Sequence, residues 1–417
     1  MVAPTARLCL AGAMRPRPSS AISLTERTRP WVELKYFTYH PQVYSRMLGH
    51  ASEDAKAGDL VAVYDKDGQR FGAGFFNPSA HVPLRMLHHG QEVVDEAFLE
   101  KLLDRACDLR DKLPGLENPA VTDAYRVIAS DADSLSGLAV DRYADTLGVE
   151  IHSLGVHKRI AKWLPYLHAR LGTKRANVRV DPSIARIERI TAPVVAGDAP
   201  PAVKIREHGI RYEVDFATGH KTGFFCDQRE NRKKLGEWVK RLGPQTRVAD
   251  LCCYTGGFSL AARLIGGAED VTGVDLDEKA IEQAKRNMNL NNTRINWVHT
   301  DAFTWARQMI ANKSLWDVIV LDPPKLVFDR EDVEGRIKYR DLNGLAIQLA
   351  KPGALLVTCS CSGQVSEDEF TEIVIAAAHH RGRKLQFLER TGAAPDHPVM
   401  SNCPESRYLK LLWARVL

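Results

Sequence analysis

The sequence lacks three features that would each define a class of protein. No apolar run is long enough to cross a membrane as a helix. The eight cysteines form no C-x-x-C pair and follow no secretory apolar segment, which argues against a disulfide framework or a zinc site. Neither sign of charge dominates, since 57 Lys and Arg face 52 Asp and Glu. We therefore expect reduced thiols, no metal, a cytoplasmic location, and a composition that permits a polyanionic partner without demanding one.

With 417 residues, the chain predicts two or three domains, each large enough to fold without crosslinks. Residues 1–30 are rich in Ala, Arg, Ser and Pro, and Glu26 is their only acid. That composition resembles an organellar transit peptide, although a disordered extension or an upstream start codon explains it as well. We expect this segment to lie outside the fold.

A small β-rich module is predicted over residues 31–112. The runs DLVAVY and RFGAGFF flank the turn DKDG, in which Asp67-Gly68 signals a hairpin. The stretch AFLEKLLDRACDLRDKL then keeps a helical apolar period. Its apolar positions are Phe98, Leu102, Leu103, Ala106 and Leu109. This helix is expected to link two domains.

A central α+β domain is predicted over residues 113–215, with strands such as TLGVEIHS and one basic helical stretch, GVHKRIAKWLPYLHARLG. No acid occurs between Ile151 and Val180. Lys158, Arg159 and Lys162 beside aromatic rings suit RNA phosphates and unstacked bases. The alternative is an apolar stripe that makes Trp163 part of the core, with the basic residues as a solvated face. That stripe consists of Ile160, Trp163, Leu164, Leu167 and Leu171. Pro165 weakens the helix prediction, and both interpretations remain open.

From residue 216 to 417 the pattern becomes strand, turn and helix, repeated from RVADLCCYTGGFSLAARLI to WDVIVLDPPK. Such alternation predicts a doubly wound, mostly parallel sheet that binds ligands at the carboxyl ends of its strands. Four predicted strand ends carry an acid. They read DLCCYTGGF with Asp250, Tyr254, Thr255 and Gly256; GVDLD with Asp275 and Leu276; HTDAF with Asp301 and Ala302; and LDPPK with Asp322.

These strand ends suit a nucleoside ligand. The glycines of the first allow close backbone approach just before a helix begins. Asp275 can accept the hydroxyls of a ribose, the role of an acid at this position in nucleoside-binding folds. Asp301 can accept from an adenine amino group, with Phe303 packing nearby. A double glycine alone is weak evidence, whereas four strand ends in register make the set specific.

The series DLCCYTGGFS, GVDLD, HTDAF and LDPPK resembles the class I S-adenosylmethionine-dependent methyltransferases. TGHKTGFFCDQRENR and the later DHP narrow the resemblance to the ribosomal RNA large subunit methyltransferase I family. Members join a PUA domain, a central domain and a Rossmann-like methyltransferase domain, and make 5-methylcytosine in 23S ribosomal RNA. The resemblance implies S-adenosylmethionine as cofactor, large-subunit ribosomal RNA as partner with Lys325 near it, and a homodimer as one further expectation. It also places Phe224, Asp227, Gln228 and Arg229 beside the cofactor.

The run VTCSCSG places Cys359 and Cys361 on one face of a predicted strand. Buried free cysteines are often just small apolar residues. Cytosine methylation at carbon 5, however, needs a thiolate that adds at carbon 6. The family's SCSG motif matches Cys361, whereas other RNA cytosine-5 methyltransferases carry their cysteine in TCS, which matches Cys359. We expect Cys361 to be the nucleophile and Asp322 to hydrogen-bond the cytosine N3 or amino group.

Two rival functions remain open from the sequence. Related folds with a DPP motif methylate a ring or exocyclic nitrogen of RNA, for example in guanine, without any thiol. A non-catalytic RNA-binding protein with a relic methyltransferase domain is the other alternative. Decay should erode the strand-end acids, and Asp250, Asp275, Asp301 and Asp322 are all present.

Overall fold

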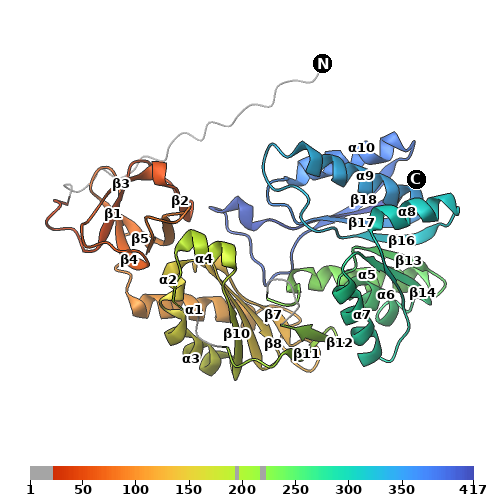
Figure 1. The fold of residues 1–417 in the computed structure, drawn as a ribbon, viewed down its shortest axis with the longest axis horizontal. Helices are drawn as coiled ribbons and strands as arrows, with labels where there is room; N and C mark the ends of the chain where they lie inside the picture. The colour runs from red at the N-terminus through yellow and green to blue at the C-terminus, as the bar shows by residue number, and fades with distance from the viewer. Residues whose placement is uncertain (1–21, 193–196, 217–221) are drawn as a thin grey trace, which may run out of the picture.

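The computed structural model describes residues 22–192, 197–216 and 222–417. Figure 1 shows three bodies: a small β module in orange, a central domain in yellow and olive, and a larger domain in green and blue. Residues 1–21 of the expected N-terminal extension lie outside the described residues. Among the described helices, none is long and apolar enough to cross a membrane.

The N-terminal module is a six-stranded sheet in the order β2-β6-β5-β4-β1-β3. Its strands are β1 (Trp31–Leu34), β2 (Gln42–Val43), β3 (Leu48–Ala51), β4 (Asp59–Tyr64), β5 (Arg70–Phe76) and β6 (Leu84–His89). The antiparallel pairing of β4 with β5 confirms the hairpin predicted around Asp67-Gly68. Buried Val32, Val61, Val63 and Leu84 form its core.

The central domain packs two long helices against a sheet in the order β10-β9-β8-β7. Its elements are α1 (Glu96–Asp111), β7 (Ala124–Ala129), β8 (Leu138–Tyr143), β9 (Thr146–Ile151), α2 (Leu154–His157), α3 (Ile160–Leu171), β10 (Arg175–Arg179) and α4 (Pro182–Glu188). The apolar stripe of α3 is buried as a set, and Trp163 is 0% exposed. Helix α3 forms despite Pro165, so the core interpretation of Trp163 is confirmed.

Helix α1 forms where the apolar period predicts it, with one difference in its buried face. Leu99, Cys107 and Arg110 are buried, whereas Leu109, one of the apolar positions of that period, is 37% exposed. A guanidinium can occupy the interior because it is paired: Arg110 donates to Asp133 at 2.7 and 2.9 Å.

The hairpin of β11 (Ala202–Glu207) and β12 (Ile210–Asp215) lies between the central domain and the third body, and the Arg206 amide donates to Asp123 of the central domain at 2.6 Å. Its alternate apolar residues Val203, Ile205, Tyr212 and Val214 share one core with the larger domain. The sequence places this segment at the end of the central domain, and that boundary stays a prediction, since a short alternating hairpin does not reveal which neighbour covers its apolar face.

The third body contains a seven-stranded sheet in the order β15-β14-β13-β16-β17-β19-β18, in which only β19 runs against the others. Its strands are β13 (Arg247–Leu251), β14 (Asp270–Asp275), β15 (Asn296–His299), β16 (Trp316–Leu321), β17 (Ala350–Ser360), β18 (Leu385–Thr391) and β19 (Lys410–Val416). Its helices are α5 (Arg229–Leu242), α6 (Gly257–Leu264), α7 (Glu278–Leu290), α8 (Ala302–Ala311), α9 (Val333–Leu349) and α10 (Glu367–His380). The strand order reverses between β13 and β16, where doubly wound sheets bind ligands.

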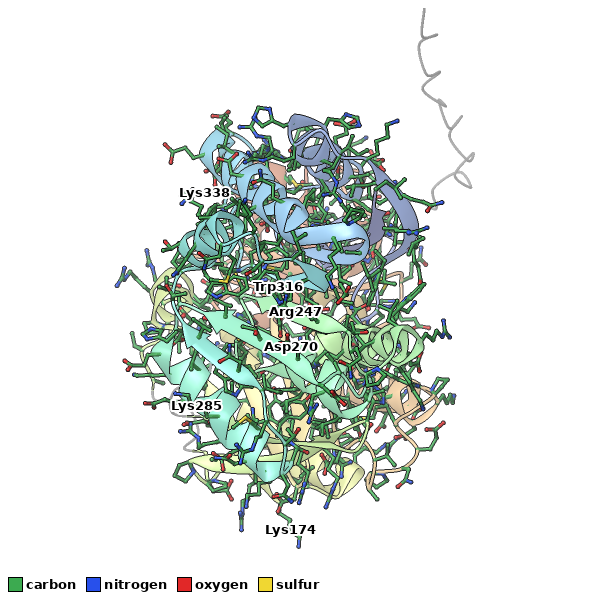
Figure 2. All side chains as sticks on the ribbon, turned by 90° about the vertical axis from the view of Figure 1, so that its right-hand side faces the viewer. Lys174, Arg247, Asp270, Lys285, Trp316 and Lys338 are labelled. Atoms are coloured by element: carbon green, nitrogen blue, oxygen red, sulfur yellow. The ribbon has the colours of Figure 1, made fainter. Side chains whose placement is uncertain are left out.

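The amino ends of β13, β14 and β16 are tied together by surface contacts, as Figure 2 shows for Arg247, Asp270 and Trp316. The Nε of Arg247 donates to Asp270 at 2.7 Å, and its guanidinium lies 5.0 Å from the centre of the Trp316 ring. These contacts lie at the end of the sheet opposite to the acidic strand ends. The carboxyl edge is therefore the place to look for a site.

Candidate active site

The loop after β13 has an unusual backbone that brings main chain to the carboxyl edge. Cys252 and Tyr254 adopt left-handed φ values of 62° and 48°, and Gly256 has φ 85°. At Gly256 a side chain would have its Cβ 2.4 Å from the Trp297 ring, so glycine is required there. Strained backbone of this kind gathers at ligand sites.

Asp250 lies completely buried at the end of β13. Its Oδ2 accepts from the amide and hydroxyl of Ser259, at 2.9 and 2.7 Å, which ties the strand to α6. Its Oδ1 is buried and has no hydrogen-bond partner in the described structure. Burial raises the pKa of Asp250 to about 7, against the hydrogen bonds from Ser259.

Asp275 closes β14 and holds the same loop. Its two oxygens accept from the Tyr254 amide at 2.7 Å and the Asp277 amide at 2.9 Å. The side chain is half-buried, and each oxygen keeps a further lone pair. The Tyr254 ring packs 5.1 Å from that of Phe225, which brings the GFFCDQ segment against the loop. Asp275 can thus order the loop and still accept ribose hydroxyls.

The third strand end is built around the start of α8. Asp301 caps the helix, because its Oδ2 accepts from the Thr304 amide and hydroxyl, both at 2.9 Å. Ala302 is buried beneath it, and Leu276 on the neighbouring strand end is 67% exposed. The carbonyl of buried Thr255 accepts from Asn287. An exposed leucine beside this acid suits the apolar face of a purine.

Asp322 follows β16 and meets the segment that begins α5. The Gln228 amide donates to its Oδ2 at 2.9 Å. Asp227 accepts from the Tyr408 hydroxyl at 2.6 Å, while its other oxygen is buried without a partner in the described structure. Burial, and after it the carboxylates of Asp227 and Asp250, raise the pKa of Asp322 to about 7. Negative charge thus gathers at this edge.

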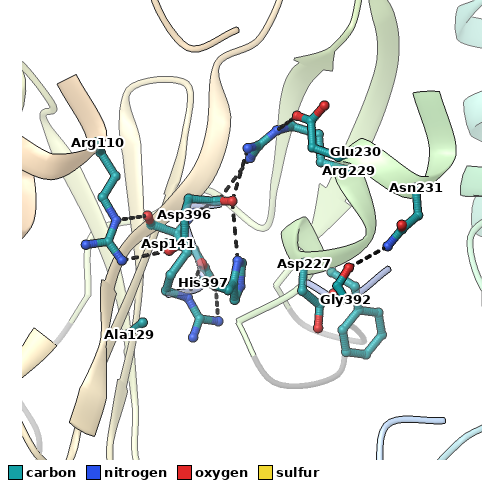
Figure 3. A network of polar contacts seen from close by, with 12 residues as sticks. Arg110, Ala129, Asp141, Asp227, Arg229, Glu230, Asn231, Gly392, Asp396 and His397 are labelled. Atoms are coloured by element: carbon teal, nitrogen blue, oxygen red, sulfur yellow. Dashed lines mark hydrogen bonds and ion pairs between the residues drawn. The ribbon is translucent and has the colours of Figure 1, made fainter. Parts of the chain in front are cut away.

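Two residues expected beside the cofactor have their side chains engaged within the protein. The Arg229 guanidinium is fully buried and donates to Asp396 at 2.9 and 3.0 Å and to Glu230 at 3.0 Å. Figure 3 shows it directed at Asp396. The Phe224 ring packs 5.0 Å from Tyr212 in the core. Any contact of these two residues with a ligand stays a prediction. The DHP sequence containing Asp396 was visible, but nothing in the pattern indicated its partner.

Both thiols of VTCSCSG lie beside Asp322, because Leu321 of β16 pairs with Thr358 of β17. Cys359 is 0% exposed, and burial together with Asp322 raises its pKa well above the usual value. Cys361, just beyond β17, is half-buried, with its Sγ 3.9 Å from the Pro323 carbonyl oxygen. Both pack against one core, and because Cys361 lies beyond β17, a shared strand face stays a prediction.

Sequence reasoning missed three buried polar groups at this edge, Tyr339, Ser362 and Lys410, and the partly buried Tyr408. Tyr339 and Ser362 are 0% exposed and Lys410 is 2% exposed. Lys410 stands at the start of the apolar run KLLWARV, where a lysine is ordinarily read as solvent-facing. No pattern in the sequence marks it as interior, since its partners are backbone carbonyls.

The expected RNA-binding lysines and arginine of α2 and α3 are paired with acids of neighbouring elements. Lys158 lies 3.4 Å from Asp59, Arg159 donates to Glu96 at 2.8 Å, and Lys162 lies 2.9 Å from Glu100. Lys325 differs, because its exposed ammonium lies 5.4 Å from the Phe328 ring centre. An RNA role for these four residues stays a prediction.

The loop before β19 returns to the N-terminal module. His40 lies 3.1 Å from Glu405, and together with Cys403 they place donor atoms within 4.8 Å of one another. Burial raises the pKa of the Cys403 thiol to about 12, which disfavours the thiolate a metal needs. All seven cysteines of the described residues are free.

The carboxyl edge fits S-adenosylmethionine on its own chemistry. Two buried carboxylate oxygens, on Asp227 and Asp250, have no hydrogen-bond partner among the described residues, and the pKa of nearby Asp322 is raised by burial and then by repulsion from these two carboxylates. A sulfonium cation would relieve that repulsion. Asp275 and Asp301 lie at neighbouring strand ends of the same edge, and their contacts with a ribose and an adenine stay predictions. The fold and this edge define an S-adenosylmethionine-dependent methyltransferase.

Comparison with known proteins agrees. The S-adenosylmethionine-dependent methyltransferase family matches residues 182–412, and a PUA-like domain matches residues 32–89. The chain belongs to the ribosomal RNA large subunit methyltransferase I family, as the resemblance predicted. The relative named so from Enterobacter sp. (strain 638) is 34% identical over 91% of this chain and 96% of its own length. The one from Erwinia tasmaniensis is 35% identical over the same shares.

Solved structures show the same fold. SMU.776, solved as a complex with SAH, superimposes with a TM-score of 0.76 at 20% identity, covering 90% of this chain and 96% of its own. A second structure, from Streptococcus mutans, reaches a TM-score of 0.75 at 20% identity over 92% of this chain and all of its own. The expected three-part α/β architecture is confirmed.

Proposed function

We propose that the protein forms 5-methylcytosine in large-subunit (23S) ribosomal RNA through a covalent adduct with Cys361. The relatives are named for ribosomal RNA of the large subunit, and a PUA-like domain precedes the methyltransferase domain. The observation that carries the proposal is the adjacency of a half-buried thiol to the Asp322-Pro323 edge, with Cys361 Sγ 3.9 Å from the Pro323 oxygen. Methylation of a nitrogen needs no thiol there.

The thiol makes cytosine reactive at carbon 5. The Cys361 thiolate adds its electron pair to carbon 6 and forms the S–C6 bond, which turns carbon 5 into an enamine-like nucleophile. The electron pair of carbon 5 would then form the bond to the methyl group, whose bond to the donor sulfonium would break and leave its electron pair on that sulfur. The carbon 5 proton leaves to water at the site, the C5–H electron pair restores the C5–C6 double bond, and the thiolate is expelled. Lys325 follows the proline pair, at the position where RNA methyltransferases with two cysteines carry their second cysteine. Release of the methylated RNA from Cys361 therefore cannot use a thiol at that position.

Cys361 is favoured over Cys359 by exposure and charge. Cys359 is completely buried, and its raised pKa keeps it protonated. A base cannot reach it without opening the core, and a protonated thiol is a poor nucleophile. Cys361 lies beyond the end of β17 and retains exposed surface. Cys359 therefore contributes packing behind the nucleophile.

Asp322 is the proposed partner of the cytosine N3 or amino group. Charge develops on the ring when the thiolate adds, and a carboxyl group of pKa about 7 exchanges a proton readily near neutral pH. The Gln228 amide holds its Oδ2 at 2.9 Å, which fixes the carboxyl plane. A carboxyl group held in this way supports the proposed contact with the base.

When bound, S-adenosylmethionine supplies an electrophilic methyl group on its sulfonium. We propose that Asp275 holds its ribose, that Asp301 with Ala302 and Leu276 holds its adenine, and that Asp227, Gln228 and Asp250 surround its methionine part. The loop Tyr254 to Gly256 supplies backbone at close range. Arg229, next to Gln228 in the chain, anchors this side of the cofactor site through its hydrogen bonds to Asp396.

Mapping the modification tests the reaction. Large-subunit ribosomal RNA from a deletion strain should lose one 5-methylcytosine, seen by bisulfite sequencing and mass spectrometry, and the purified protein should restore it. Loss of a methylated guanine instead would establish nitrogen methylation. Failure of the protein to bind S-adenosylmethionine would favour a non-catalytic RNA-binding relic. The expected homodimer and cytoplasmic location stay predictions.

A further inference from the structure

A buried polar cluster lies directly behind the turn that carries Cys361. The Tyr339 hydroxyl is 3.0 Å from the Ser362 hydroxyl and accepts from the Ser360 hydroxyl at 3.2 Å. The Val327 amide donates to the Ser362 hydroxyl at 3.3 Å. Ser362 thereby joins the turn after β17 to the loop that follows Asp322.

Lys410 completes this cluster with a charge. It stands opposite Ser360 in the β17–β19 pairing, and its ammonium donates to the carbonyls of Ser362 at 2.6 Å and Val365 at 2.7 Å. The side chain is 2% exposed. Within the part of the chain that the structure describes, no carboxylate oxygen lies close enough to the Lys410 ammonium, within 4.0 Å, to form an ion pair with it. A buried cation without a paired anion is costly unless something compensates it.

We propose that Lys410 is a positioning residue for Cys361, which fixes the turn through Ser362 and supplies the positive charge that favours the Cys361 thiolate. The inference rests on the proposed function, in which Cys361 is the nucleophile. An ammonium held near a cysteine stabilises the thiolate over the thiol. Because its hydrogen-bond partners are neutral carbonyls, its charge is not cancelled by direct pairing.

The charges around Lys410 agree with this role. Burial lowers its pKa to about 8, and Cys361 is the strongest opposing influence, followed by Glu369; Arg407 lowers the pKa and Glu367 raises it. Glu369 is engaged by Arg336, and Glu367 by Arg407 at the surface. Lys410 therefore keeps its proton at neutral pH and loses it above about pH 8.

Alkylation of Cys361 by iodoacetamide, followed by peptide mass spectrometry between pH 6 and 9, tests the charge without RNA or activity. In Lys410→Met the rate at pH 7 should fall about tenfold, the effect of one pKa unit on the thiolate fraction, and its rise should move to higher pH. Lys410→Arg should stay near the parent. Buried Cys359 serves as the internal reference, since its alkylation would report opening of the core.

The outcomes separate the two proposals. An unchanged or faster alkylation profile in folded Lys410→Met overturns the charge role. If Lys410→Met fails to fold, Lys410→Gln, which keeps hydrogen bonding without charge, gives the same comparison, and a parent-like profile there overturns the inference equally. Binding of S-adenosylmethionine should be unchanged in each variant. If Cys361→Ala retains methyl transfer, the proposed function fails, whereas the alkylation result still decides on Lys410.

Discussion

The guanidinium of Arg229 donates two hydrogen bonds to the carboxylate of Asp396, one to each oxygen, at 2.9 and 3.0 Å. Asp396 also accepts from the Arg126 amide at 2.7 Å, and its carbonyl accepts from Arg110 at 2.6 Å. Against the effect of burial, His397 and Arg229 hold the pKa of Asp396 below its usual range. One residue of the DHP sequence thus clamps α1 and β7 of the central domain to α5 of the methyltransferase domain.

Removal of this clamp should destabilise the whole chain. Asp396→Ala removes the buried partner of the Arg229 guanidinium and leaves it only the partly exposed Glu230, which costs up to about 3 to 5 kcal/mol, and unfolding in urea measures it. Asp341→Ala is the matched control, since its pair with Arg340 is half exposed on both sides and should change stability by about 1 kcal/mol or less. Equal effects of the two substitutions would contradict the clamp.

The two thiols should differ in a trapping experiment. RNA containing 5-fluorocytidine at the target should form a covalent complex with the parent protein, because fluorine at carbon 5 cannot leave as a proton. Cys361→Ala should abolish the complex and methyl transfer while S-adenosylmethionine still binds. Cys359→Ala should still form the complex. The reverse pattern would exchange their roles, and activity in the double variant would favour nitrogen methylation.

Asp275→Ala should weaken S-adenosylmethionine binding by about tenfold or more, since one hydrogen bond to a charged group is worth about 1.5 to 3 kcal/mol. Calorimetry measures the dissociation constant. Asp270→Ala, at the exposed opposite end of the same strand, is the control and should leave it unchanged. Equal affinities of parent and Asp275→Ala would remove this residue from the cofactor site.

Binding of the cationic cofactor should strengthen as pH rises through about 7. The pKa values of Asp250 and Asp322 are raised to about 7, so both carboxyls are largely neutral at pH 6 and ionised at pH 8. A cation binds the ionised form better and releases protons. Below pH 7, each carboxyl group that must ionise should raise the affinity for S-adenosylmethionine by up to about tenfold for each pH unit. In Asp322→Asn, which has one such group fewer, the affinity should rise less steeply with pH. A flat profile in the parent would argue against these pKa values.

RNA binding should depend on Lys325 more than on the basic helical stretch. Lys325→Ala should reduce the salt dependence of RNA affinity by about one phosphate contact. Combined substitution of Lys158, Arg159 and Lys162 by Ala should leave that slope nearly unchanged, because each already has an acidic partner. If the triple variant alone flattens the slope, the helical stretch is an RNA surface.

Strand ends and core stripes were predictable because they follow from local chemistry. The acids Asp250, Asp275, Asp301 and Asp322 each end or follow a strand of one parallel sheet, as alternation of strands and helices requires. The stripe through Trp163 was visible because its spacing is set by the helix itself.

Partners distant in sequence could not be read in the same way. Asp396 meets Arg229 across 167 residues, and Lys410 meets Ser362 across 48. The acids that pair with Lys158, Arg159 and Lys162 come from other elements, so the sequence of the stretch does not reveal these ion pairs. The hairpin at 202–215 was assigned by order along the chain, which does not show that its apolar face shares a core with the later domain.

The position of β19 between β17 and β18 affects how the chain can fold while the ribosome makes it. The apolar strand β17 has no neighbour on that side until Lys410–Val416 emerges, some fifty residues later. Through that interval the nascent chain presents an open sheet edge, together with the turn that holds Cys361. A stalled or prematurely ended chain would therefore combine an aggregation-prone edge with an unsupported nucleophile. Once β19 pairs with β17, the sheet edge is covered and the turn that holds Cys361 is supported.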